Sequence, residues 1–194
     1  MVVYPFREFA RTLIMLAMMA LLVSIFAYSC HAQWTARIDS IARATEQEFG
    51  FPHGTCRAFA LQESNYDSLA TREESSYFNA GSRYQSQIKK DALAFCAAHP
   101  EYDLPVSVER AQRSISTGFF QIMGEGFRTL GYDAEFIEPS LIEQFHYFGL
   151  FVRPLFARYH SLAKVAAAYN TGNPKRTGRS YDRNIVRYQR KFSY

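Results

Sequence analysis

The stretch Ala58-Phe59-Ala60-Leu61-Gln62-Glu63-Ser64-Asn65-Tyr66-Asp67 joins an apolar helix pattern to an abrupt polar end. The residues before Glu63 are mostly small or apolar and include neither Gly nor Pro, which predicts a helix packed against a buried wall. Ser, Asn and Asp follow at once, and their side chains bond nearby backbone, so they favour the end of a helix. We therefore expect Glu63 at the C-terminal end of a largely apolar helix.

A carboxyl group at such a helix end is a candidate general acid. The negative pole of the helix and the apolar surroundings both disfavour its ionisation. A Glu that stays protonated near neutral pH can donate a proton to a leaving group. A water-facing Glu on an amphipathic helix is the other interpretation of this stretch alone.

The chain has 194 residues, of which 48% are hydrophobic and 16% aromatic. This length and composition predict one domain of ordinary size, with a core of its own and a short appendage. We find no internal repeat or low-complexity tract in the sequence. A formal net charge of +4 is mild, and it suits an acidic polymer without requiring one.

The appendage is the segment 1–32. Arg7 and Arg11 precede the apolar run Leu13–Ala27, and small residues follow, as in a secretory signal. The run is shorter than the roughly 20 apolar residues of a full membrane span, although an uncleaved N-terminal anchor is the alternative. The sequence thus predicts export, to the periplasm or to the outer side of the inner membrane. Residues 33–194 form the predicted functional domain, which would meet the membrane only through segment 1–32.

Positive charge gathers near the C-terminus, where we expect a solvated basic helix face. An exported protein rarely meets nucleic acid, so we predict no nucleic-acid partner. Cys56 and Cys96 remain if segment 1–32 is removed, and a disulfide or two separate thiols are both open. No Cys/His pair has the spacing of metal ligands, so we expect neither a metal site nor a cofactor. The basic residues are Lys175, Arg176, Arg179, Arg183, Arg187, Arg190 and Lys191.

Helical periodicity dominates the rest of the chain, and no segment alternates convincingly with period two. The pattern predicts an all-α fold with at most a minor hairpin. An ordered loop is expected around Tyr77–Tyr84, a helix start at Ser116–Met123, and a kink or break near Pro154. The other predicted helices cover 34–49, 85–98, 105–113, 141–159, 162–169 and 180–192.

Three blocks of the sequence together resemble the signatures of lytic transglycosylases of the soluble-lytic type. They are Glu63-Ser64 with Ala70, then Gly118-Phe119-Phe120-Gln121-Ile122-Met123, then Ala168-Tyr169-Asn170-Thr171-Gly172. Tyr181–Tyr188 resembles the Tyr-containing helix that follows the third block. The resemblance covers about residues 35–190 and implies a goose-type lysozyme-like fold.

The resemblance implies cleavage of the MurNAc–GlcNAc β-1,4 bond of peptidoglycan, with formation of a 1,6-anhydromuramoyl end. Glu63 would be the single general acid and base. Ser64, Gln121, Tyr169 and Asn170 would hold the N-acetyl and sugar groups. Phe119 and Phe120 would form the cleft floor, while Gly118 would allow the close approach of a ligand or another backbone.

The sequence also departs from the family pattern. Glu63 and Gly118 lie 55 positions apart (118 − 63 = 55), more than in compact members, so the insert's Arg72-Glu73-Glu74 and Tyr84 would line the cleft. If Asp67, Glu73 or Glu74 positions a water molecule, the enzyme would be a hydrolytic muramidase.

A non-catalytic peptidoglycan-binding assembly module is the interpretation from another functional class. An intact Glu63 counts against it, because binding alone does not need a shielded acid. Wall turnover, an envelope-spanning secretion or conjugation machine, and phage lysis are all compatible with the sequence as cellular roles.

Overall fold

The computed structural model describes residues 5–74 and 83–193 of the chain. It divides into two compact units, one ending at Ser40 and the other beginning at Ile41. Most of the loop predicted around Tyr77–Tyr84 lies outside the described residues; Tyr84 itself is exposed in a helix.

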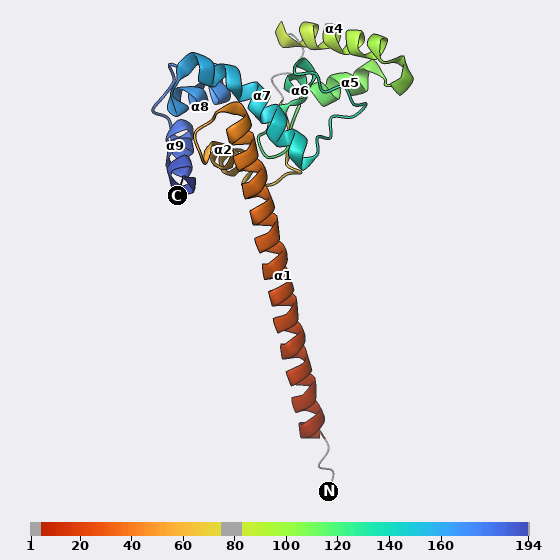
Figure 1. Ribbon diagram of the computed structural model, residues 1–194. Coiled ribbons are helices and arrows are strands. Elements are labelled where there is room, and N and C mark those ends of the chain that lie inside the picture. The colour runs from red at the N-terminus through yellow and green to blue at the C-terminus, as the bar shows by residue number, and fades with distance from the viewer. Residues whose placement is uncertain (1–4, 75–82, 194) are drawn as a thin grey trace. The chain divides into compact units, whose positions relative to one another are not determined.

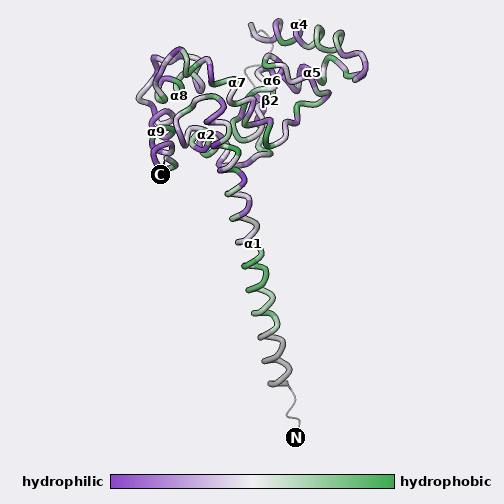
Figure 2. The backbone as a smooth tube through the Cα atoms, in the orientation of Figure 1, coloured by the Kyte–Doolittle hydropathy of each residue, from purple (hydrophilic) through white to green (hydrophobic). Residues whose placement is uncertain are grey.

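Helix α1 (Pro5–Phe49) supplies the N-terminal unit and continues into the second unit (Figure 1). From Met15 to Tyr28 its side chains are exposed, and most of them are apolar, as the green section of Figure 2 shows. Among the described residues, α1 from Met15 onward is the one helix long and apolar enough to cross a membrane. A signal sequence has the same properties, so the role of segment 1–32 as signal or anchor stays a prediction.

The second unit is mostly helical, as the sequence predicts for a lysozyme-like domain. Helix α7 continues through Pro154 without a break. Helix α9 packs on α2 and α8, α8 on α7, and α5 on α4 and α6. Beyond α1, the helices are α2 (Thr55–Ser64), α4 (Arg83–Ala98), α5 (Val106–Arg113), α6 (Gly124–Thr129), α7 (Leu141–Tyr159), α8 (Leu162–Thr171), α9 (Ser180–Phe192) and the 3-10 helix η1 (Pro100–Tyr102).

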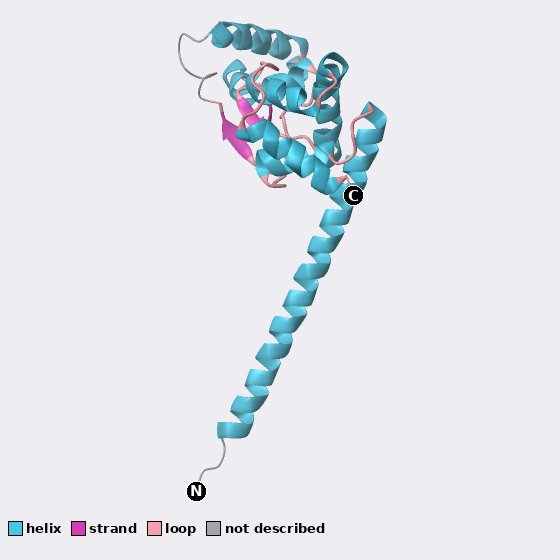
Figure 3. Ribbon diagram, turned by 90° about the vertical axis from the view of Figure 1, so that its left-hand side faces the viewer, coloured by secondary structure: helices cyan, strands magenta, loops and turns pink. Residues whose placement is uncertain are grey.

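A small antiparallel sheet, magenta in Figure 3, has the strand order β1-β2-β3. Its strands are β1 (Thr71–Glu73), β2 (Ile115–Thr117) and β3 (Ile122–Met123). The helix start predicted at Ser116–Met123 is therefore wrong, because this segment is the β2–β3 hairpin. Gly118 and Gln121 have φ values of 76° and 49°, and left-handed residues so close together cannot continue a right-handed helix.

Aromatic side chains form the core between the hairpin and the helices. The Phe120 ring stacks on Phe148 of α7 with centroids 4.0 Å apart, and Phe59 of α2 lies 5.2 Å from the same ring. Phe119 and Phe145 are also fully buried. Contacts among these rings hold α2, α7 and the hairpin together. Cys56 and Cys96 are free thiols, so of the two open alternatives the structure has the separate thiols.

Candidate active site

Glu63 is the second-to-last residue of α2, as the sequence predicts. The helix ends because Asn65 and Tyr66 both adopt left-handed conformations, with φ values of 54° and 64°. The Asn65 N–H donates to the Leu61 carbonyl at 3.2 Å, and the Tyr66 N–H donates to the Ala60 carbonyl at 3.3 Å. These bonds use carbonyls that a helix end leaves unpaired. The chain turns away directly after Glu63 and leaves its carboxyl group half-buried.

The nearest polar partner of Glu63 is Tyr181, whose hydroxyl donates to Glu63 Oε1. Tyr181 lies in the first turn of α9, and Asp182 fixes that turn. Its carboxylate accepts the N–H groups of Gly178 at 2.8 Å and Arg179 at 2.9 Å. A carboxylate bound to the first N–H groups stabilises a helix start, so Asp182 determines where α9 begins and where Tyr181 lies.

Burial raises the pKa of Glu63 above its ordinary value. The hydrogen bond from Tyr181 and the charge of Arg72 oppose that shift, whereas the charge of Glu74 adds to it. Burial is also the first cause that raises the pKa values of Tyr169 and Tyr181, and the Glu63 charge is the second. Both phenols therefore stay neutral and can donate hydrogen bonds, while Glu63 keeps its proton to a higher pH than an exposed Glu.

The three sequence blocks of the resemblance meet at this site. The Ser64 hydroxyl donates to the Phe119 carbonyl at 3.0 Å, and the Tyr169 hydroxyl donates to the Phe120 carbonyl at 2.5 Å. These bonds tie α2 and α8 to the β2–β3 turn. The hydroxyl groups of Ser64 and Tyr169 thus donate to the backbone and position the site. Their contact with a sugar stays a prediction.

Gly118 accommodates a close approach, but by a protein side chain. A Cβ atom at Gly118 would lie 2.3 Å from Gln144 Oε1, closer than van der Waals contact allows. The Gln144 oxygen accepts the Phe119 N–H at 2.9 Å, and its nitrogen donates to the carbonyl of Ser68 at 3.1 Å. Gln121 is a similar link, since its amide nitrogen donates to the carbonyls of Ala70 and Gly118, each at 3.0 Å.

Phe119 and Phe120 do not form a cleft floor with their side chains. They are 0% and 1% exposed, because the turn directs both rings toward α7. Their role at the site comes through their backbone carbonyls, which accept from Ser64 and Tyr169. Burial of such large apolar rings is favourable. Composition alone cannot show whether two adjacent aromatic residues in a turn bind a sugar or fill the core.

Glu74 directly follows β1 and is half-buried. Its Oε1 accepts the Ser116 hydroxyl at 2.8 Å and pairs with Arg72 Nη2 at 2.6 Å. Arg72 and Ser116 face each other in the β1–β2 register. Because Arg72 and Glu74 both act on the pKa of Glu63, the sheet edge contributes to the electrostatics of the site.

The other predicted residues lie in exposed positions. Asn170 is exposed near the end of α8, and Glu73 is exposed on β1. The Asp67 carboxylate accepts the Leu69 N–H at 2.9 Å and so closes the turn after α2. Tyr181 is the partner that sequence reasoning did not assign to Glu63. Its signal was the Tyr-containing helix after the third block, but that pattern does not say which carboxyl group the tyrosine meets.

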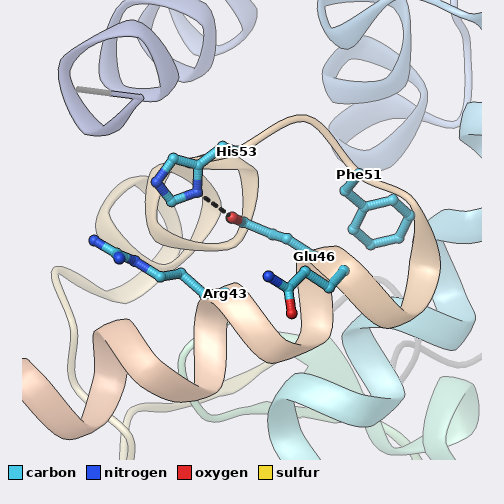
Figure 4. A pocket seen from close by; sticks show the side chains of 5 residues that line it. Arg43, Glu46, Phe51 and His53 are labelled. Atoms are coloured by element: carbon cyan, nitrogen blue, oxygen red, sulfur yellow. Dashed lines mark hydrogen bonds and ion pairs between the residues drawn. The ribbon is translucent and has the colours of Figure 1, made fainter.

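A hollow of about 290 Å³ lies away from Glu63, lined by Arg43, Glu46, Gln47, Phe51 and His53 (Figure 4). Glu46 points at His53 there, and the His53 Nδ1 lies 2.9 Å from Glu46 Oε2. Glu46 also accepts the N–H of Gly54 at 3.0 Å and that of Cys56 at 2.8 Å. Because both oxygens are bound to the start of α2, we assign Glu46 a structural role.

The arrangement around Glu63 can donate a proton, with two neutral phenols and a charged sheet edge close to it. Among the described residues, no group of three or more His, Cys, Asp or Glu side chains could hold a metal ion. A carboxyl group whose pKa is raised by burial can act as a general acid.

Comparison with known proteins gives one match. Residues 44–193 match the family model described as N-acetylmuramidase. No curated protein matches the chain, and neither does any solved structure. The matched region contains α2, the hairpin, α8 and α9, and it therefore includes both Glu63 and Tyr181.

Proposed function

This chain belongs to the N-acetylmuramidase family, and we propose that within it the chain acts as a lytic transglycosylase on peptidoglycan. In this proposal Glu63 is the single general acid and base that breaks the MurNAc–GlcNAc β-1,4 bond. The family assignment supports a peptidoglycan-cleaving, lysozyme-like domain, whereas the lyase chemistry is our proposal.

The convergence of the three blocks on Glu63 carries the proposal. Ser64 and Tyr169 are bonded to the β2–β3 turn, so the blocks that resemble lytic transglycosylases form one structure around the acid. Burial raises the pKa of the Glu63 carboxyl group, which favours its protonated form, and the Tyr181 hydroxyl donates to it. A protonated, oriented carboxyl group is what the first step of glycan cleavage requires.

The proposed reaction needs only this carboxyl group. Glu63 protonates the glycosidic oxygen as the bond from the muramic C1 breaks, and becomes a carboxylate. The 6-hydroxyl of the same sugar then attacks C1, and Glu63 takes the hydroxyl proton as the C1–O6 bond forms. The product is a 1,6-anhydro ring, no water is consumed, and Glu63 ends protonated as it began.

Hydrolysis is a second candidate, and Glu74 is the observation that favours it. Its carboxylate is held by Ser116 and Arg72 close enough to act on the pKa of Glu63. A protonated and an ionised carboxyl group in different environments are the usual pair of a hydrolytic glycosidase. If Glu74 activated water opposite Glu63, the product would carry a reducing end.

Mass spectrometry of the soluble products separates the two reactions. Purified peptidoglycan is digested with the full chain in a non-ionic detergent, and we expect muropeptides that lack one water and carry anhydro ends. Reducing ends would establish hydrolysis instead. Glu74→Gln adds a second readout: a transglycosylase should keep most of its activity, whereas a hydrolase that uses Glu74 as base should lose about 10²-fold or more.

We also propose that residues 1–32 direct export of the functional domain, as a cleaved signal or as an anchor. The exposed apolar side chains of α1 support this, because such a run is unstable in water. Fusion of alkaline phosphatase after residue 194 should give activity outside the cytoplasm. Deletion of 2–32 should abolish it, and retained activity would contradict the proposal.

A further inference from the structure

A second groove lies on the face shared by α8 and α9, with a volume of about 360 Å³. Its charged rim comes from Arg183, Arg187 and Arg190, which follow the i, i+4, i+7 spacing of one helix face. All three arginines are exposed. Ala163 and Val186 provide its apolar wall.

Positive charge in this groove is not neutralised by its own lining. Asp182 is the acidic residue among the lining residues, but it is buried and its oxygens accept the Gly178 and Arg179 N–H groups. Within the ranges that the structure describes, no ion pair involves the rim arginines. Arg187 contacts its neighbour Tyr188, at 5.0 Å from guanidinium carbon to ring centroid. The groove therefore presents guanidinium groups to an external anion.

The groove is distinct from the Glu63 site, although α9 serves both. Tyr181 points from α9 toward Glu63, and Ile185, one turn later, is fully buried. The rim arginines occupy the opposite, exposed side of the same helix. An α-helix is about 10 Å across with its side chains, so the two sites lie on opposite walls of one narrow element.

We propose that this groove binds the carboxylates of the short peptide stems that peptidoglycan carries, an inference that rests on the proposed peptidoglycan-cleaving function. A guanidinium group binds a carboxylate through two parallel hydrogen bonds, which gives both strength and geometry. Ala163 and Val186 offer a surface for small apolar side chains such as the alanine methyl groups of these stems.

Length is compatible with this assignment. An extended peptide of about four residues spans roughly 14 Å, enough to pass the end of α9 from a sugar near Tyr181. A stem from a neighbouring strand could enter the groove directly. A membrane surface is the competing anionic partner, but it would use cations spread over an open face, whereas these arginines border one bounded groove.

Sedimentation binding to two forms of peptidoglycan tests the proposal. The full chain carries Glu63→Gln so that the polymer stays intact, and it is mixed with whole sacculi or with stripped sacculi. The stripped sacculi are the peptide-free glycan strands that an amidase leaves, coupled to beads so that they sediment. The groove variant adds R183Q, R187Q and R190Q. The matched control adds K89Q, K90Q and K175Q, which remove the same charge from exposed positions outside the groove.

We expect the groove variant to bind whole sacculi about tenfold more weakly, and stripped sacculi as well as its parent does. The control should keep the affinity of the parent for both. Unchanged affinity of the groove variant, equal weakening on stripped sacculi, or equal weakening of the control would overturn the proposal. Binding to vesicles of anionic phospholipid is measured as well. A loss of binding confined to these vesicles would also overturn the proposal and would assign the groove to the membrane.

Two further measurements keep the outcomes separate. Melting of each variant by circular dichroism shows whether it is folded, and an unfolded triple variant is replaced by single Arg→Gln changes. Muropeptide release by the chain with Glu63 intact tests the proposed function on its own. A chain that releases products but shows no peptide dependence would refute the groove and leave the function standing.

Discussion

Glu109 of α5 is fully buried, and two arginines bind its carboxylate: Arg113 Nε lies 2.7 Å from Oε1 and Arg128 Nη2 lies 2.8 Å from Oε2. Half-buried Glu63 of α2 instead receives the neutral hydroxyl of Tyr181. Both residues lie in helices of the same domain, and burial raises the pKa of Glu63.

The difference lies in what replaces water around each carboxyl group. Arg128 also donates to the carbonyls of Tyr132 at 2.9 Å and Ala134 at 2.6 Å, so the ion pair at Glu109 belongs to a satisfied network. Such a network fixes the packing of α4, α5 and α6. Around Glu63 the lost hydration is replaced mainly by a hydroxyl, and burial raises the pKa of the carboxyl group. The first environment suits a structural ion pair, and the second favours the protonated form that our proposal requires.

The substitution of Glu63 by Gln should have the largest effect on activity. Gln cannot donate a proton to the glycosidic oxygen, so muropeptide release should fall roughly 10³-fold. Gln can still accept from Tyr181, and binding to sacculi should persist. Release is measured by mass spectrometry, and activity above a tenth of the parent's would refute the role of Glu63.

The same variant should also change the thermal stability of the protein, by an amount that depends on pH. Since the folded pKa of Glu63 is raised, its contribution to stability is full below the unfolded pKa and is lost as pH rises through the folded pKa. Glu63→Gln should therefore melt at the same or a higher temperature than the parent at neutral pH, and the difference should shrink in acid. A lower melting temperature at neutral pH would contradict this.

The identical change at Glu109 should have the opposite profile. Glu109→Gln removes the charge between two buried arginines, and leaving a buried pair without one partner costs about 3 to 5 kcal/mol. The free energy of unfolding, measured by denaturant titration, should fall by that amount. Activity per folded molecule should change little, because Glu109 contacts none of the residues around Glu63. A loss under 1 kcal/mol would mean that the network is not a stabilising unit.

Sequence reasoning predicted the helices and the position of Glu63 at the end of α2, but not its contact with Tyr181. Periodicity gave α4, α5, α7, α8 and α9 within a few residues, since each buries one apolar stripe. The turn residues after Glu63 marked the end of α2. The contact between Tyr181 and Glu63 was not predicted because the two residues lie 118 positions apart, and only the packing of α9 on α2 brings them together.

The hairpin was not predicted because it depends on a contact between residues distant in the sequence. Ser116–Met123 has a capping residue and an apolar face, which suit a helix start. Gln144 of α7, however, fills the space that a Cβ at position 118 would occupy, so glycine is required there. The resemblance implies a cleft floor for Phe119 and Phe120, but both rings are buried in the core. Whether this segment forms a hairpin, and whether its rings are buried, depends on residues far away in the sequence, which a local sequence pattern does not include.

Glu46 adds a further buried carboxylate to the comparison, held by backbone N–H groups instead of arginines. Glu46→Gln turns one acceptor oxygen into a donor that faces the Gly54 or Cys56 N–H, so one bond at the start of α2 is lost. Leaving such a group unsatisfied costs about 1 to 3 kcal/mol. Denaturant titration should place this loss below that of Glu109→Gln.

His53 supplies the control for Glu46, because it contacts the same carboxylate from a side chain that is 44% exposed. His53→Ala removes a partner that water can replace, so the free energy of unfolding should change by less than about 1 kcal/mol. If His53→Ala cost as much as Glu46→Gln, the bond to His53 rather than the helix start would be the important one.

Tyr181→Phe should have the smallest effect, and it tests how the hydroxyl partner of Glu63 influences the pKa of the carboxyl group. It removes the hydroxyl that donates to Glu63, and because that bond lowers the pKa of Glu63, the pKa should rise further. A general acid loses activity as pH rises through its pKa, so the alkaline limb of the pH–rate profile should move to higher pH. Tyr188→Phe, in the same helix, should leave the limb in place. A move of the Tyr181→Phe limb to lower pH would mean that Tyr181 does not stabilise the carboxylate, and the acid at Glu63 would then owe its state to burial alone.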